Sequence, residues 1–226
     1  MTNGKGDMRM IKSATFYTNR LKSLRRFYGF VLGLDVTEST DEQFTIRVGS
    51  SEMTFKQTEA AAYYHFAINI PGNQFSMMKY WLSDRLTLNR DSGRDEIYFA
   101  GFDADSLYFE DPAGNIVELI GRRKRDLFGD LSKESFLNVS EIGIVTPFVT
   151  DVGEQLMDAG IPLRKGTEVD PSGLNFLGQD DWYVVLVPPG RRWYFSDALA
   201  ETFPLAFTWG EGQRISIDSN GRIQLE

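Results

Sequence analysis

Glu118 is the side chain whose surroundings point most directly to chemistry. It follows a tight turn at 111–115 and lies on a predicted strand in which Ile116, Glu118 and Ile120 share one face. Burying a carboxylate between two isoleucines is costly unless it is paired, hydrogen-bonded or bound to a cation. Glu118 is therefore a candidate catalytic or metal-ligating residue, and the alternative is a position on a solvated face of a sheet.

His65 is the single histidine of the chain, and it lies in a predicted strand at 63–70. An imidazole near a carboxylate titrates near physiological pH, so His65 and Glu118 could form an acid–base couple or share a metal ion. A lone histidine in an apolar strand can equally be a structural residue, hydrogen-bonded through both nitrogens. The chain contains no cysteine, which excludes disulfides, thiolate metal ligands and a cysteine nucleophile.

A repeated pattern of elements, about fifty residues long, positions these two side chains. Apolar residues at helical spacing alternate with short apolar runs typical of strands, which gives the order β-α-β-β-β twice. The predicted elements are, in order, strand 11–18, helix 21–32, strands 34–39, 43–48 and 52–57, then strand 63–70, helix 75–86 and strands 95–101, 106–110 and 115–120. The sequence therefore predicts a mixed α/β fold built from two modules.

Two segments carry a family resemblance. Residues 21–34 (LKSLRRFYGFVLGL) resemble the first helix, and residues 109–119 (FEDPAGNIVEL) resemble the closing turn and strand, of the vicinal-oxygen-chelate superfamily. This superfamily includes glyoxalases, fosfomycin and bleomycin resistance proteins and extradiol dioxygenases. The resemblance covers residues 10–122 and implies paired modules that form one curled sheet, or cup. In that family the cup holds a divalent metal that chelates two neighbouring oxygens of the substrate.

The resemblance also implies one metal ligand on the first strand and one on the last strand of each module. In the second module these positions are His65 and Glu118, which are both ligand types. In the first module they fall on Ser13 and Thr54, whose hydroxyls are poor ligands for a transition metal. A stable site generally wants three or four protein ligands, so we expect any divalent metal to be weakly bound. The residues expected to bind substrate in the cup are Ser13, Tyr17, Thr54, Asn69, Tyr98 and Tyr108.

The rest of the chain repeats the pattern incompletely. The first-strand ligand position falls on Ile144 and no closing glutamate follows, so we expect this third, degenerate module to supply no metal ligand. Its predicted elements are strand 139–149, helix 151–159 and strands 162–166, 174–178, 182–187 and 192–195. Residues 219–221 (SNG) predict a C-terminal hairpin. The expected organisation is a loose N-terminus at 1–9, two modules at 10–122, a linker at 123–137 and the third module with its hairpin at 138–226.

Composition limits the partners. A net charge of −8 and a pI near 4.8 argue against nucleic acid, which binds basic surfaces. The one basic run, at 122–125, is expected to be a solvated linker. No apolar run reaches the length of a membrane span, and the absence of cysteine fits a cytoplasmic location. Open sheet edges in the third module could pair with a second subunit to form a homodimer.

Two functions stay open from the sequence. The first is an enzyme of the vicinal-oxygen-chelate type, a lyase or dioxygenase that acts on a small oxygen-bearing or aromatic molecule through His65 and Glu118. The second is a non-catalytic protein that binds or sequesters a small molecule on the same fold, as bleomycin-resistance proteins do. The missing first-module ligands favour the binding protein, and the retained His65 and Glu118 favour the enzyme.

Overall fold

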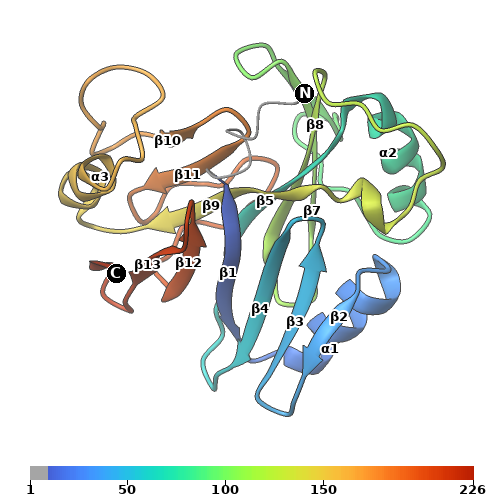
Figure 1. The fold of residues 1–226 in the computed structure, drawn as a ribbon, viewed down its shortest axis with the longest axis horizontal. Coiled ribbons are helices and arrows are strands. Elements are labelled where there is room, and N and C mark those ends of the chain that lie inside the picture. Colours follow the sequence, from blue (N-terminus) through green and yellow to red (C-terminus); the bar gives the residue numbers. More distant parts are fainter. Residues whose placement is uncertain (1–9) are drawn as a thin grey trace.

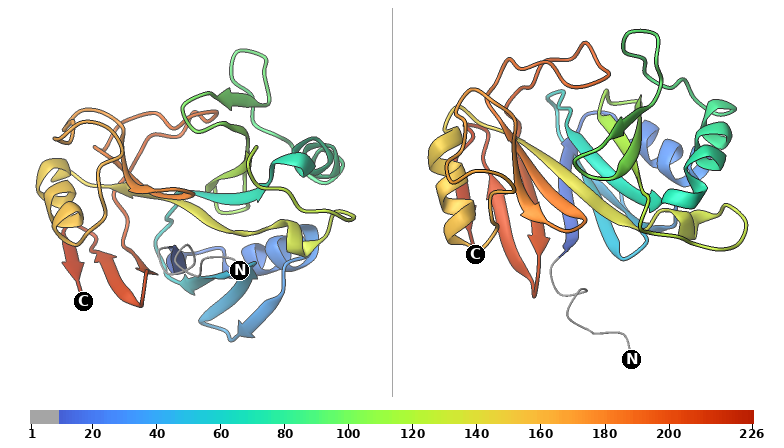
Figure 2. Two further views of the ribbon diagram at one scale, coloured as in Figure 1. Left: turned by 45° about the horizontal axis from the view of Figure 1, so that its top comes forward. Right: turned by 90° about the horizontal axis from the view of Figure 1, so that it is seen from above.

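The computed structural model describes residues 10–226, and the predicted loose N-terminus at 1–9 lies outside the described residues. Two curled seven-stranded sheets lie one on the other, with helices at their flanks (Figures 1 and 2). The mixed α/β class, with β-α-β-β-β modules and a third partial module, is therefore confirmed. None of the described helices is long and apolar enough to cross a membrane.

The elements follow the chain as three modules and a final group of strands. The first module contains β1 (Ile11–Thr18), α1 (Leu21–Arg26), the π-helical turn η1 (Phe27–Val31), β2 (Val36–Ser39), β3 (Gln43–Val48) and β4 (Ser51–Gln57). The second contains β5 (His65–Pro71), the 3₁₀ turn η2 (Gly72–Gln74), α2 (Phe75–Ser83), β6 (Ile97–Phe99), β7 (Ala104–Glu110) and β8 (Ile116–Arg122). The third contains, after the 3₁₀ turn η3 (Lys133–Ser135), β9 (Asn138–Val145), α3 (Val149–Asp158), β10 (Asn175–Gln179) and β11 (Trp182–Val187). The final strands are β12 (Leu205–Trp209), β13 (Gln213–Ile217) and β14 (Ile223–Leu225).

The modules pair differently from the expectation. One sheet has the order β14-β13-β12-β1-β4-β3-β2, and the other has the order β10-β11-β9-β5-β8-β7-β6. The second module therefore shares its sheet with the third, and the first module shares its sheet with the C-terminal strands. The expectation that the two modules of residues 10–122 curl into one cup is wrong.

The burial of the first strands explains this pairing. Every residue of β5 is buried, and β9 is buried at all positions after its first residue. In β1, by contrast, buried residues alternate with partly exposed ones over most of the strand. A strand that is buried on both faces suits the centre of a covered sheet, whereas a half-buried strand suits a sheet with one solvated face. The two most buried first strands, β5 and β9, accordingly pair antiparallel at the centre of one sheet.

The hydrophobic core lies between the two sheets. Phe16 of β1 stacks on Phe66 of β5, with ring centroids 5.1 Å apart. Because side chains alternate along a strand, the neighbours of Phe66 at positions 65 and 67 point to the opposite face of the second sheet. The fold thus directs His65 away from the core between the sheets and onto the opposite face, called here the free face because the first sheet does not cover it.

The local turns largely agree with the sequence. Gly114 in the β7–β8 turn and Gly221 in the C-terminal hairpin both adopt positive φ, of 83° and 84°, as expected for these turns. The strands expected at 162–166 and 192–195 are wrong, because these segments form only isolated bridges. The second of them instead carries Trp193 over the free face of the second sheet, where its ring packs at a tilt against His65.

Candidate metal centre and active site

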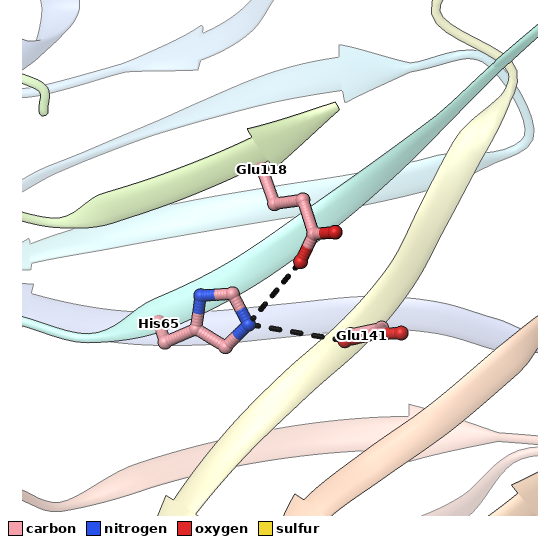
Figure 3. A group of neighbouring side chains, drawn as sticks. All are labelled: His65, Glu118 and Glu141. Atoms are coloured by element: carbon pink, nitrogen blue, oxygen red, sulfur yellow. Dashed lines mark ion pairs between the residues drawn. The ribbon is translucent and has the colours of Figure 1, made fainter. Parts of the chain in front are cut away.

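Three titratable side chains converge on the free face of the second sheet (Figure 3). His65 comes from β5, Glu118 from β8 and Glu141 from β9. The Nε2 atom of His65 lies 3.7 Å from Oε2 of Glu118 and 3.8 Å from Oε2 of Glu141. One ligand atom from each residue lies within 4.8 Å of the others, and all three side chains are buried. The expectation that His65 and Glu118 share one site agrees with this geometry.

The register of three strands produces the cluster. Ala67 of β5 is the Cα partner of Glu118 on β8 and of Glu141 on β9. The two glutamates therefore flank a small side chain, which leaves the space above it open to both carboxylates. His65 is two residues before Ala67 on the same face of β5, so its imidazole lies beside that space.

Glu141 is a candidate ligand that the sequence-based expectations do not include. The β5–β9 register shifts next to Ala67, as in a β-bulge, and bulges commonly re-aim side chains beside active sites. Glu141 lines the cavity, whereas Ile144, the expected ligand position, is fully buried in the core. The expectation that the third module has no metal-site residue of its own is therefore wrong, because Glu141 belongs to the candidate cluster. Glu141 in the segment VSEIGIV is, like Glu118, a carboxylate within a mostly apolar strand, so the sequence carries the same signal for both residues.

One backbone contact determines which nitrogen of His65 faces the carboxylates. His65 Nδ1 lies 3.1 Å from the carbonyl oxygen of Ile116. A carbonyl oxygen can only accept a hydrogen bond, so Nδ1 carries the proton and donates. In the neutral imidazole, the lone pair of Nε2 therefore points at the two carboxylates. This is the usual arrangement of a metal-ligating histidine.

The buried charges require a proton or a cation. Burial and the nearby Glu141 raise the pKa of Glu118 to about 7, partly offset by His65. For His65, burial disfavours the charged form, but hydrogen bonding to Glu141 and the charges of Glu118 and Glu141 outweigh it and raise its pKa. Two buried carboxylates that face one lone pair are stable only when positive charge lies between them.

A divalent metal fits this set of donors. One imidazole nitrogen and two carboxylate groups are common ligands of zinc, manganese and iron. The donor atoms surround one point, and the backbone contact of His65 supplies the outer support that such sites need. Three protein ligands on a cavity wall leave further coordination positions facing the cavity.

The cluster lies in a cavity of about 200 Å³. Trp193 covers His65 with its ring centroid 4.8 Å from the imidazole, and Tyr108 stacks on Phe195 at 4.8 Å. The hydroxyl of Ser106 is buried in the wall beside Glu118. The other residues of the wall are mostly aromatic or aliphatic: Phe99, Phe102, Ala104, Ile120, Leu174, Phe176, Val185 and Tyr194.

Of the residues expected to bind substrate, two lie at or behind this cavity. Tyr108 lines it beside Glu118. Asn69 is buried next to it and accepts a hydrogen bond from Arg122. Tyr98 is 45% exposed and hydrogen-bonds to Asp103 outside the cavity.

The other three expected residues lie on the first sheet. Ser13 hydrogen-bonds to Thr208, and Thr54 hydrogen-bonds to Thr45. Tyr17 lies on β1, where the odd-numbered positions point away from the core, as Thr54 does on β4. Their placement with His65 in one cup is therefore wrong, because the first and second modules belong to different sheets.

Arg122 also differs from its expectation. It is the last residue of β8 and is 5% exposed, with its side chain in the cavity wall. The basic run at 122–125 is therefore not entirely a solvated linker.

Comparison with known proteins supports the fold and connects the third module to an enzyme family. Residues 139–191 match the family model described as toxoflavin-degrading enzyme. This segment contains Glu141 and covers less than a quarter of the chain. A search of the curated proteins finds no match.

Two solved structures are similar over most of the chain. A putative dioxygenase from Bacillus subtilis is 14% identical with a TM-score of 0.58, and the match covers 89% of this chain and 70% of that one. A glyoxalase I variant from Zea mays is 13% identical with a TM-score of 0.56, covering 95% of this chain and 90% of the other. At such identity the likeness shows the fold. The resemblance to the vicinal-oxygen-chelate superfamily is thus confirmed at the level of the fold.

Proposed function

We propose that this chain, which has the fold of the vicinal-oxygen-chelate proteins, is a metal-dependent enzyme acting on a small aromatic molecule with two neighbouring oxygens. The observation that carries the proposal is the convergence of His65, Glu118 and Glu141 in a cavity with aromatic walls. A bound divalent cation would supply the positive charge that holds and polarises the two oxygens. Three protein ligands argue for firmer binding than the two expected from the sequence, and they leave positions open for substrate, as in catalytic sites.

The surrounding residues orient the cluster and the substrate. The carbonyl of Ile116 holds Nδ1–H of His65, which keeps Nε2 directed at the metal position. Burial, together with the charge and hydrogen bonding of Glu118, raises the pKa of Tyr108 well above its usual value. Tyr108 therefore stays protonated and can donate a hydrogen bond toward Glu118 or a substrate oxygen. Trp193 shields His65 from water and offers a face on which a flat ring can stack.

The walls of the cavity favour the dioxygenase branch over the glyoxalase branch. Tyr108, Phe176 and Trp193 are three of the aromatic side chains that line it. Such walls suit a planar aromatic molecule better than a flexible polar one, because apolar rings bury and stack most favourably against one another.

Oxygen consumption tests the proposed reaction. The protein is stripped with a chelator, reloaded with Mn²⁺, Fe²⁺ or Zn²⁺, and mixed with a panel of catechols in an oxygen electrode. Toxoflavin is added to the panel because of the family match at 139–191. We expect metal-dependent oxygen uptake with at least one compound, and loss of uptake in Glu141→Gln. The matched control is Glu52→Gln, an exposed glutamate on β4 that pairs with Arg47. Absence of turnover with every metal and compound would contradict the proposal.

A further inference from the structure

Arg122 is a buried charged residue of the cavity wall that the proposed metal chemistry does not use. Its Nε donates to Oδ1 of Asn69 at 2.8 Å. Its Nη2 donates to Oγ of Ser140 at 2.9 Å and to the carbonyl oxygen of Asp181 at 3.3 Å. The remaining amino group, Nη1, makes no hydrogen bond to any residue between 10 and 226. A guanidinium that is 5% exposed and has a free donor group on a cavity wall is suited to a ligand oxygen.

The nearby carboxylate of Asp181 does not fully balance the positive charge of Arg122. Oδ1 of Asp181 lies 3.5 Å from Nε of Arg122, and the same carboxylate also pairs with Arg125. Two guanidinium groups therefore share one carboxylate. Arg191 also lines the cavity and has no carboxylate partner within the described part of the chain. The cavity thus offers guanidinium groups as well as the carboxylates of Glu118 and Glu141, and positive charge on a cavity wall attracts anions.

Arg122 and the candidate metal centre lie along the same sheet face. Asn69, which holds Nε of Arg122, is four residues after His65 on β5, so their Cα atoms are about 13 Å apart on one face. Ser140, which holds Nη2, directly precedes Glu141. A single elongated small molecule can therefore contact both ends of the cavity.

We propose that Arg122 binds a carboxylate of the substrate, so that the substrate is an anionic aromatic molecule with two neighbouring oxygens. The inference rests on the proposed function, because it takes those oxygens to be held at the cluster of His65, Glu118 and Glu141. The planar guanidinium matches a carboxylate, and a charge-assisted hydrogen bond is stronger than a neutral one. Asn69, Ser140 and Asp181 hold the guanidinium in place, so its orientation does not depend on the ligand.

The first test compares two probes that differ in charge alone. The full chain, loaded with Mn²⁺ and kept free of oxygen, is titrated calorimetrically with 3-(3,4-dihydroxyphenyl)propanoate and with its uncharged primary amide. We expect the acid to bind about tenfold more tightly, or better, as a buried charge-assisted hydrogen bond predicts. Equal affinities would overturn the role of Arg122 and leave the proposed function standing. Failure of both probes to bind would overturn the proposed function itself.

The second test locates the anion. Arg122→Gln should lose the preference for the acid while keeping the affinity of the wild-type protein for the amide, and Arg122→Lys should keep part of the preference. Arg123→Gln is the matched control, because Arg123 is half-exposed and pairs with Asp105, and it should keep the full preference. If Arg122→Gln does not fold, Asp181→Asn replaces it: removal of the competing carboxylate should increase the preference for the acid. An unchanged preference in Arg122→Gln or in Asp181→Asn, or its loss in Arg191→Gln, would overturn the proposal.

Discussion

Oε2 of Glu141 lies 3.8 Å from Nε2 of His65, although the two residues belong to different modules. The contact exists because β9 of the third module pairs with β5 of the second, which brings Glu141 opposite Ala67. The third module thus completes a site that the second module alone would leave with two strong ligands. We propose that these three side chains together hold one divalent metal.

Loss of Glu141 should greatly weaken metal binding. A ligand that binds the folded state at 100 times its Kd adds about 2.7 kcal/mol of stability, which corresponds to a rise in Tm of roughly 5–10 °C for a chain of this size. We expect such a rise on adding Mn²⁺ to the chelator-treated wild-type protein. Glu141→Gln should show almost no rise, because loss of a direct ligand costs more than the roughly 10–100-fold lost with an outer partner.

Differential scanning fluorimetry measures the Tm of the wild-type protein and of Glu141→Gln with and without Mn²⁺. Glu52→Gln serves as the charge-matched control on the first sheet. A rise of the same size in Glu141→Gln would mean that the metal lies elsewhere.

The stability of the metal-free protein should fall as the pH rises from about 4.5 to about 7 through the contribution of Glu118. Its pKa is raised from 4.5 to about 7 by burial and by Glu141, so in this window the folded state holds a proton that the unfolded chain has released. The folded state then binds more protons, and the free energy of unfolding decreases with pH. His65 acts in the same direction, because its pKa is higher in the folded state than in the unfolded chain. Its contribution to stability is complete at a pH below the unfolded-state pKa and is lost as the pH rises through the folded-state pKa.

Urea unfolding of the chelated protein at pH 5 and pH 8 measures this effect against Glu118→Gln, which stays neutral throughout. Relative to the wild-type protein, the free energy of unfolding of the variant should increase from pH 5 to pH 8 by up to roughly 3 kcal/mol. A difference between the two proteins that does not change with pH would rule out a perturbed Glu118.

Gly143→Ala should disturb the site without changing its charge. A Cβ atom at position 143 would lie 3.0 Å from the carbonyl oxygen of His65 and 3.1 Å from the indole ring of Trp193. Overpacking of this kind costs roughly 1–3 kcal/mol and forces neighbours to move. We expect a lower Tm, an altered tryptophan emission and a smaller Mn²⁺-induced rise in Tm. Gly101→Ala is the control, since the nearest atom there is 3.7 Å away. Equal behaviour of the two variants would argue against close packing of Trp193 on His65.

Tyr28→Phe should destabilise the fold while leaving the metal site intact. Tyr28 of η1 donates to Oδ2 of buried Asp111 at 2.6 Å, and Asp111 also accepts from the side chain and backbone of Asn115. Removing one donor from a buried carboxylate costs roughly 1–3 kcal/mol. Urea unfolding should show this loss against Tyr80→Phe, whose side chain is 74% exposed. A loss of Mn²⁺ affinity along with stability would show that this turn and the cluster are coupled.

The sequence predicts those parts of the fold that depend on local patterns. The predicted strands at Ile11–Thr18, Gln43–Val48 and Trp182–Val187 have the observed bounds. The turn before Glu118 also forms where Pro112 and Gly114 predict it, with Gly114 at positive φ. Alternation along a strand and the residues of tight turns are local properties, so they can be recognised without knowledge of the partners.

The pairing of the modules could not be predicted in this way. The first strands of all three modules contain apolar residues, and the choice of β9 as partner of β5 depends on burial over both faces, which becomes visible only in the assembled sheets. Glu141 was missed for the same reason, because its place opposite Ala67 depends on this pairing and on a shift of register. The sequence places Arg122 in a basic run at 122–125, and only its burial against Asn69 and Ser140 distinguishes it from the other residues of that run.

Anomalous X-ray diffraction from crystals soaked in Mn²⁺ would locate the bound metal. We expect one strong anomalous peak per chain at the manganese edge, at coordination distance from Nε2 of His65 and from carboxylate oxygens of Glu118 and Glu141. Crystals of Glu141→Gln grown in the same way should lose the peak or show it at low occupancy. A peak bound by other residues, or no peak in the wild-type protein at saturating Mn²⁺, would rule out a metal centre at these three residues.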